Sequence, residues 1–147
     1  MQRYKNHGIA FQYPEDWMLE EENNEGDTTI TVTDGETSFW SLHLMRERPQ
    51  VEEVIEEIET AFKGEYDEVD VERSTRQLAR REAEAREISF VCLELVNTAF
   101  VRVFRTGRFT VMILCQATDH ELEDARTNFE AIADSLDVDL DGDILIS

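Results

Sequence analysis

The amino-acid sequence predicts an α+β fold, an α/β/α sandwich with helices packed on both faces of an antiparallel sheet of about six to seven strands. Short turns join successive strand-like segments, as in antiparallel neighbours. The central segments 88–93 and 111–115 are apolar on both sides, whereas a sheet with one wet face would alternate apolar and polar residues. Two amphipathic helical segments are available to cover these strands.

The N-terminal third of the chain has the pattern of strands joined by turns. Segment 8–14 carries apolar residues at alternate positions and stops at Pro14, as is typical of a strand. Further along, Asp34-Gly35 is a strong signal for a tight hairpin. We therefore expect strands over 8–14, 17–20, 28–33 and 38–45, and an acidic loop over 21–27.

Two segments carry apolar residues along one side of a helix. The first begins after Pro49, and Gly64 predicts its end. The second follows the segment 118–121, which has the spacing of a capping box, and it runs to about Leu136. The apolar stripes consist of Val51, Val54, Ile55, Ile58 and Phe62 in the first helix, and of Leu122, Ala125, Phe129, Ile132 and Leu136 in the second.

An antiparallel meander fills the chain between the two helices. Segment 68–74 alternates apolar and polar residues, and three longer strand candidates follow it. Short turns are expected at Asn97-Thr98 and over 106–108. The three longer strands are expected over 82–96, 98–105 and 109–117.

Length and charge bound the possible functions. The 147 residues suit a single domain over 1–147, with 137–147 as an acidic C-terminal tail. The 34 acidic and 14 basic side chains give a net charge of −20, which argues against nucleic-acid and anionic-membrane partners. The sequence contains no apolar run typical of a membrane span or signal peptide. Cys92 and Cys115 lie in apolar segments and are expected to be reduced thiols, so we expect a cytoplasmic protein.

The segment 8–17, with its alternating strand followed by Tyr13-Pro14, two residues and Trp17, resembles the opening of the PsbP-like superfamily. Segment 129–136 resembles the final helix of the same group, and the order of elements between them is similar. The resemblance implies an α/β/α sandwich and a binding function without catalysis. Members include the photosystem II extrinsic protein, a eukaryotic Ran-binding nuclear-import factor, bacterial DcrB-type proteins and chaperones of type VI secretion effectors. The matching residues are structural, so the resemblance implies no site residue.

No catalytic or cofactor-binding constellation stands out in the sequence. The histidines His7, His43 and His120 do not have metal-ligand spacing, and neither a nucleophile elbow nor a phosphate-binding glycine loop is present. We therefore expect no enzyme, no cofactor and no metal.

The acidic tail contains the one motif that suggests a metal. Asp137, Asp139, Asp141 and Asp143 match the first half of an EF-hand calcium loop. The bidentate glutamate of position 12 is missing, because the sequence ends at Ser147, position 11. Four carboxylates without this closing ligand would bind Ca²⁺ only weakly, so we expect a solvated tail.

Two groups of residues are candidates for contacting a partner. Phe39 and Trp40 are adjacent in a strand and point to opposite faces, so one is expected in the core. The other is either covered by a helix or exposed, and an exposed aromatic is a candidate for binding a partner. Arg102, Arg105 and Arg108 belong to a run of arginines whose forked guanidinium groups suit carboxylates. The alternative is that these arginines neutralise the acidic helices and protect edge strands.

The sequence thus favours a non-catalytic protein-binding or adaptor domain of bacterial origin, which contacts another protein through a sheet edge or the Phe39/Trp40 region. A second hypothesis is a cytoplasmic chaperone for type VI secretion effectors, which implies a groove for apolar helices and a homodimer. A third is an enzyme that uses clustered carboxylates.

Overall fold

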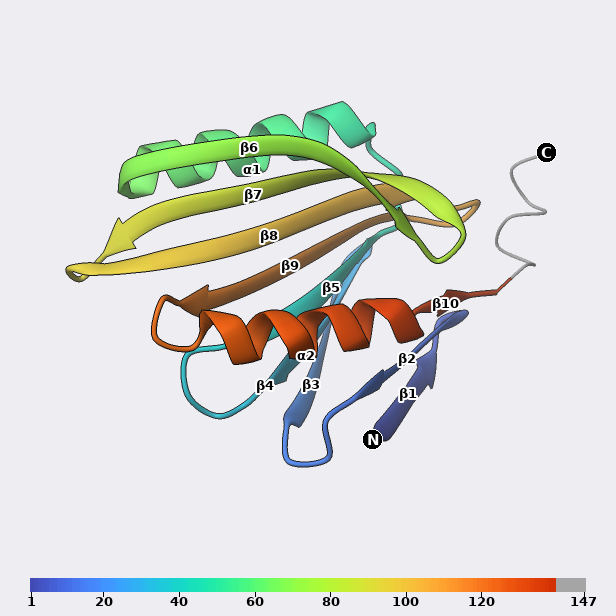
Figure 1. Ribbon diagram of the computed structural model, residues 1–147. Helices are drawn as coiled ribbons and strands as arrows, with labels where there is room; N and C mark the ends of the chain where they lie inside the picture. Colours follow the sequence, from blue (N-terminus) through green and yellow to red (C-terminus); the bar gives the residue numbers. More distant parts are fainter. Residues whose placement is uncertain (140–147) are drawn as a thin grey trace.

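The computed structural model describes residues 1–139 and shows two helices and two antiparallel sheets (Figure 1). Seven strands form the main sheet in the order β3-β4-β5-β9-β8-β7-β6, and three form a smaller sheet in the order β1-β2-β10. The elements are β1 (Gln2–Asn6), β2 (Ile9–Tyr13), β3 (Met18–Asn24), β4 (Asp27–Thr33), β5 (Phe39–Met45), α1 (Val51–Glu65), β6 (Asp67–Leu78), β7 (Arg81–Cys92), β8 (Leu95–Arg105), β9 (Thr110–Thr118), α2 (Leu122–Ser135) and β10 (Asp137–Val138).

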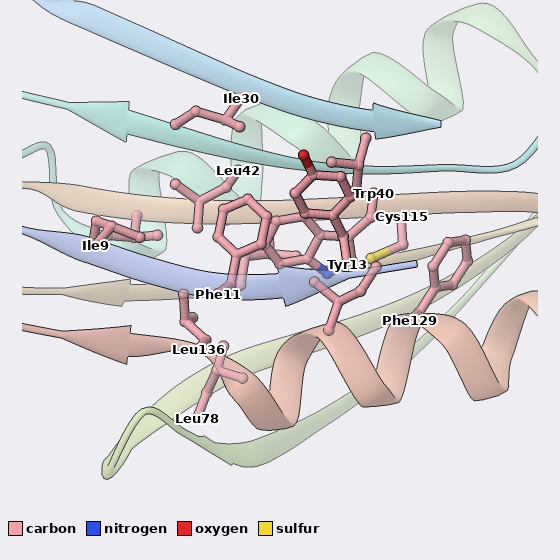
Figure 2. Packing of buried hydrophobic residues seen from close by; sticks show 14 of the residues in the cluster. Ile9, Phe11, Tyr13, Ile30, Trp40, Leu42, Leu78, Cys115, Phe129 and Leu136 are labelled. Atoms are coloured by element: carbon pink, nitrogen blue, oxygen red, sulfur yellow. The ribbon is translucent and has the colours of Figure 1, made fainter. Parts of the chain in front are cut away.

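The main sheet contributes side chains to two separate apolar cores. Helix α1 packs against β6, β7 and β8, whereas α2 packs against β2 and β9. Along β8, Val101 lies in the core that contains Phe62 of α1, and its neighbour Phe100 lies in the core that contains Phe129 of α2 (Figure 2 shows the second core). Because successive strand residues point to opposite faces, central strands such as β8 must be apolar on both sides.

The smaller sheet is a feature that the sequence analysis did not predict. Strand β2, expected from the alternation over 8–14, pairs with β1 and with β10 rather than with the main sheet. Its residue Phe11 is fully buried, and its ring centroid lies 4.8 Å from that of Trp40 on β5. Strand β2 therefore helps α2 to cover the apolar side of β5.

Several boundaries differ from the expected ones. Most of the expected acidic loop over 21–27 is strand, because β3 pairs with β4 as far as Asn24 and Asp27. Gly64 lies inside α1, which ends at Glu65. The residue that precedes α2 as its N-cap is Glu121, and Thr118 still belongs to β9.

Two hairpin turns occupy left-handed backbone without any glycine. Leu93 and Glu94 join β7 to β8 with φ angles of 52° and 67°, and Ala79 and Arg80 join β6 to β7 with φ angles of 49° and 68°. Two-residue hairpin turns of this kind normally carry Asn-Gly. For a residue with a Cβ atom, the left-handed backbone conformation costs about 1–2 kcal/mol, because the Cβ approaches the following carbonyl oxygen. Because Leu93-Glu94 lacks this Asn-Gly signal, the sequence does not mark the turn between β7 and β8, and it predicts that turn at Asn97-Thr98 instead.

Replacing Leu93 and Glu94 with Asn and Gly should raise the free energy of unfolding by about 1–2 kcal/mol. Urea denaturation of this double variant measures the gain. The double variant Leu93→Ala/Glu94→Ala removes the same exposed side chains but keeps the Cβ atoms, so it should show no comparable gain. Equal stability of the Asn-Gly variant and the unsubstituted chain would contradict the argument.

Candidate functional site

One side of the main sheet is only partly covered. Helix α1 lies over β6, β7 and β8, away from β3, β4 and β5 (Figure 1). On β5, Trp40 enters the core that contains α2, so Ser41 and His43 must point to the opposite side, the side of α1. Half-buried side chains are frequent on this side of β4, β5 and β9. We call this region the open sheet face, and it consists of Thr31, Thr33, Phe39, Ser41, His43, Leu114 and Gln116.

Hydroxyl groups and a few apolar groups alternate across the open sheet face. Phe39 lies between Thr33 of β4 and Gln116 of β9. In the next row, Ser41 lies beside Thr31. The strand register thus places apolar contacts beside hydrogen-bonding groups, a combination that suits a protein partner.

A short hydrogen-bond chain holds His43 in the floor of this face. Its two ring nitrogens lie 3.3 Å from Thr29 Oγ1 and 3.0 Å from Ser41 Oγ. Ser41 donates its hydroxyl proton to the carbonyl oxygen of Leu114 at 3.0 Å, so it accepts a hydrogen bond from His43 Nε2. Burial lowers the pKa of His43, against a smaller opposing effect of Asp27, and favours the neutral ring. The group fixes the floor of the face in one arrangement.

The charge along this side of the sheet is negative. Glu20 and Glu22 of β3 lie in register with Thr31 and Thr29 of β4, at the edge of the open sheet face. In the described chain, no lysine or arginine lies on this side of β3, β4, β5 or β9. A cationic partner would therefore meet carboxylates along the β3 border of this face.

The structure separates the two aromatic partner candidates. Phe39 is half-buried and lies on the open sheet face. Trp40 is 0% exposed and lies in the core that contains α2 and β2, so it has no surface to offer a partner. The alternation along β5 is as expected, and the position of α2 and β2 decides which of the two residues is covered.

The structure does not bring the three arginine candidates together. Arg102 lies on the α2 side of β8, because its neighbour Val101 lies on the α1 side. Arg105 donates to the carbonyl oxygen of Arg48 at 2.9 Å, just before α1. Arg108 lies in the turn before β9 and close to Gly8. The expected cluster fails because alternate residues of one strand point to opposite sides.

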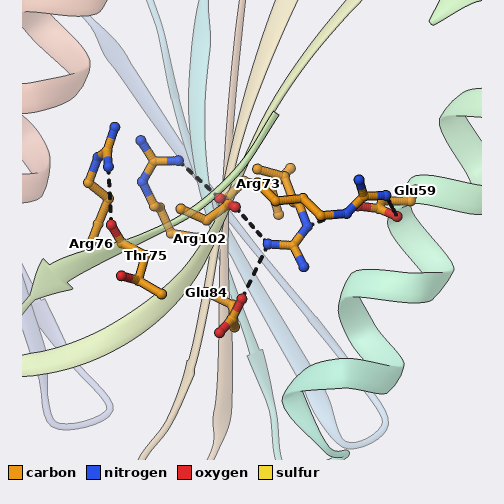
Figure 3. A network of polar contacts seen from close by, with 9 residues as sticks. Glu59, Arg73, Thr75, Arg76, Glu84 and Arg102 are labelled. Atoms are coloured by element: carbon orange, nitrogen blue, oxygen red, sulfur yellow. Dashed lines mark hydrogen bonds and ion pairs between the residues drawn. The ribbon is translucent and has the colours of Figure 1, made fainter. Parts of the chain in front are cut away.

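Other arginines of the same region pair with the acidic helix α1. Arg86 and Arg73 donate to the carboxylate of Glu59 at 2.9 and 3.3 Å, and Arg86 also contacts Glu84 (Figure 3). These contacts agree with the interpretation that the arginines neutralise the acidic helices.

The loop before β5 is tied to the start of α2 by one carboxylate. Glu121 accepts hydrogen bonds from the hydroxyl groups of Thr37, Ser38 and Thr118. These bonds, above all that from Thr37, lower the pKa of Glu121. The capping-box residues Thr118 and Glu121 therefore interact through their side chains, whereas a capping box consists of side-chain bonds to backbone N–H groups.

The described part of the calcium motif begins as strand β10, and Asp139, just after this strand, donates its backbone N–H to the carbonyl oxygen of Gly8 at 2.7 Å. Asp137 belongs to β10 and pairs in register with Ala10, and its carboxylate lies 3.4 Å from Arg80 Nη2. Asp141 and Asp143 lie outside the described residues. Within residues 1–139, no three metal-ligating side chains form a group that could hold an ion.

The two cysteines are free thiols, Cys92 half-buried and Cys115 buried. Burial raises the pKa of Cys115, which keeps its sulfur in the neutral form. Neutral buried thiols behave as small apolar groups.

Comparison with known proteins gives similarity at the level of the fold. No family model and no curated protein matches the sequence. Among solved structures, the cyanobacterial PsbP (CyanoP) from Synechocystis sp. PCC 6803 superposes with a TM-score of 0.62 at 15% identity, over 93% of this chain and 91% of that one. The chain has a PsbP-like fold.

Two further structures share the PsbP-like fold. LpqN of Mycobacterium tuberculosis, described as involved in cell envelope biogenesis, gives a TM-score of 0.56 at 13% identity, over 94% of this chain and 90% of that one. A structure from Bacteroides thetaiotaomicron gives a TM-score of 0.57 at 13% identity over 89% of this chain, which spans 45% of that protein. Within residues 1–139 of the present chain, neither helix is long and apolar enough to cross a membrane.

Proposed function

We propose that the chain is a non-catalytic protein-binding domain that docks a basic segment of another protein on the open sheet face. The observation that carries this proposal is the partial cover given by α1. The helix packs against β6, β7 and β8 and leaves the same side of β4, β5 and β9 with half-buried side chains. Such a surface is already partly desolvated, so a partner gains contacts there at a small cost.

Charge supports a basic partner. Glu20 and Glu22 border the open sheet face on one side, and α1, with Glu52 and Glu53 in its first turn, borders it on the other. The whole chain has a net charge of −20, which would accelerate the approach of a cation. Lysine and arginine side chains of the partner would then pair with the acidic borders, while its apolar side chains contact Phe39.

The composition of the face supports this proposal over two alternatives. A chaperone of apolar effector helices needs an apolar groove, whereas the open sheet face consists mostly of hydroxyl-bearing and polar side chains, with Phe39 and Leu114 between them. An enzyme that uses clustered carboxylates needs free acids that converge, but Glu59 and Glu87 are in ion pairs with arginines. The binding function is therefore the one we propose.

Two finer features belong to the same proposal. We treat the fold as an α/β/α sandwich, which is supported by the alternation of Phe100 and Val101 between the α2 and α1 cores.

We place the domain in the cytoplasm, which is supported by the free thiols of Cys92 and Cys115. The description of LpqN points to an envelope setting for that protein, so fractionation of cells that express the native chain is the appropriate check.

A positive charge in the open sheet face should weaken docking. We expect Thr31→Arg to reduce the affinity for a twelve-residue peptide of alternating lysine and valine at least fivefold, measured by fluorescence anisotropy at low salt. The matched control is Thr75→Arg on β6, an exposed threonine outside the face, which changes the net charge equally and should alter the affinity less than twofold.

The same experiment includes a peptide in which glutamate replaces lysine, and this peptide should not bind. Equal effects of Thr31→Arg and Thr75→Arg would show that the attraction is only the overall charge. Binding of the acidic peptide as tightly as the basic one would overturn the assignment of a basic partner.

A further inference from the structure

A pocket of about 90 Å³ lies between α2 and the main sheet, on the side opposite the open sheet face. We call it the α2 pocket. Trp40, Ile113 and Phe129 belong to its apolar lining, and the guanidinium groups of Arg76, Arg102 and Arg126 also line it. Two carboxylates, Glu87 and Glu130, line it as well, which leaves one positive charge in excess.

A buried hydrogen-bond donor in the α2 pocket has no partner. The indole nitrogen of Trp40 is buried, and it finds no acceptor in the described chain. Figure 2 shows this nitrogen on the side of the ring that faces Cys115, which also lines the pocket. An unsatisfied buried donor costs about 1–3 kcal/mol, so an acceptor that reaches this nitrogen by displacing a neighbouring side chain would recover free energy.

The half-buried cation Arg102 feels the charge of Glu87 but forms no ion pair with it. Among residues 1–139 it forms no ion pair, and its guanidinium donates only to the carbonyl oxygen of Val101, at 3.0 Å. The nearby Glu87 is paired with Arg126 at 3.5 Å. Arg76 and Arg102 lie side by side across β7 (Figure 3), and Arg76 donates to the backbone of Thr75. Three guanidinium groups against two carboxylates leave one positive charge in excess in the pocket, which favours an anionic ligand.

Small side chains make room for this pair of arginines. In the strand register, Arg76 of β6 lies beside Ala83 of β7, and Arg102 of β8 lies beside Ala85. Both alanines are fully buried and extend only a methyl group toward the α2 side. The register therefore lets both long side chains lie over β7 at the pocket.

We propose that the α2 pocket binds a small organic monocarboxylate with an apolar body. The carboxylate accepts hydrogen bonds from Arg102 and is stabilised by Arg76, because guanidinium forks match carboxylate geometry. The body packs against Ile113 and Phe129, and an oxygen at its far end accepts the hydrogen bond of Trp40 Nε1. A cavity of about 150 Å³ holds benzene, so the smaller α2 pocket takes no more than one ring, and part of the ligand must lie outside the enclosed volume of about 90 Å³.

The proposal is independent of the open sheet face and is tested by calorimetric titration with 4-hydroxybenzoate, which carries a carboxylate and an oxygen at opposite ends of one ring. The unsubstituted chain should bind it with a dissociation constant below 1 mM. Arg102→Gln should weaken binding at least tenfold, which corresponds to about 1.4 kcal/mol. The matched control Arg108→Gln removes an arginine outside the pocket and should leave the dissociation constant within twofold.

Three further measurements guard against misfolding and nonspecific attraction. Ala133→Leu fills the α2 pocket but keeps every arginine, so it should weaken binding at least tenfold while thermal unfolding shows a folded chain. Trp40→Phe removes the indole donor, so this variant should bind 4-hydroxybenzoate no more tightly than it binds benzoate, which lacks the ring oxygen. Benzylamine, a cation of similar shape, should not bind. The absence of heat at 10 mM 4-hydroxybenzoate, equal effects of the two arginine variants, or equal binding of benzylamine would overturn the proposal.

Discussion

Replacing Trp40 with alanine should lower the free energy of unfolding by about 3–5 kcal/mol. The side chain is fully buried at the centre of the core that contains α2. Its ring lies 4.8 Å from that of Phe11, centroid to centroid, and this contact joins the smaller sheet to the main one. Among the described residues, the substitution removes the largest fully buried side chain of the core, and it leaves a cavity that the two sheets can close only partly.

The adjacent residue supplies a matched control for this prediction. Phe39→Ala removes an aromatic ring from the same strand, but from the half-buried open sheet face. We expect it to cost about 1 kcal/mol, because much less apolar surface is involved. Urea denaturation followed by circular dichroism compares the two variants. Similar losses for both would mean that Trp40 does not hold the two sheets together.

Phe39 and Trp40 also show which features of the candidate site can be predicted from the sequence and which cannot. Their adjacency in a strand-like segment predicts opposite faces, and the structure agrees. Which of them is buried depends on the position of α2 and β2, and these segments lie far away in the chain. Local periodicity carries no information on that contact, so the sequence alone left both residues as candidates.

Three other features of the structure are not predicted by the sequence for a similar physical reason. Strand β1 consists mainly of exposed polar side chains, and the backbone pairing with β2 rather than an apolar stripe defines it. The turn at Leu93-Glu94 lacks the glycine that usually marks left-handed backbone. Arg102 lies within an apolar strand, where only the register with β7 and the position of α2 reveal a pocket.

Removing the carboxylate of Glu59 should destabilise the contact between α1 and the sheet. The carboxylate is 13% exposed and lies between Arg86, which is 12% exposed, and Arg73, which is 58% exposed. Glu59→Ala would leave the buried guanidinium of Arg86 with the more exposed Glu84 as its acidic partner. We expect a loss of about 2–3 kcal/mol in the free energy of unfolding, because one member of a buried ion pair is left uncompensated.

Double-mutant cycles separate the two arginines that share this carboxylate. The cycle of Glu59→Ala with Arg86→Ala should give a coupling energy of about 1–2 kcal/mol, whereas the cycle with Arg73→Ala should give less than about 0.5 kcal/mol, since an exposed cation is screened by water. Equal couplings would show that burial does not distinguish the pairs. A larger coupling to Arg86 would mean that the less exposed of the two arginines contributes most of the neutralisation of Glu59 on α1.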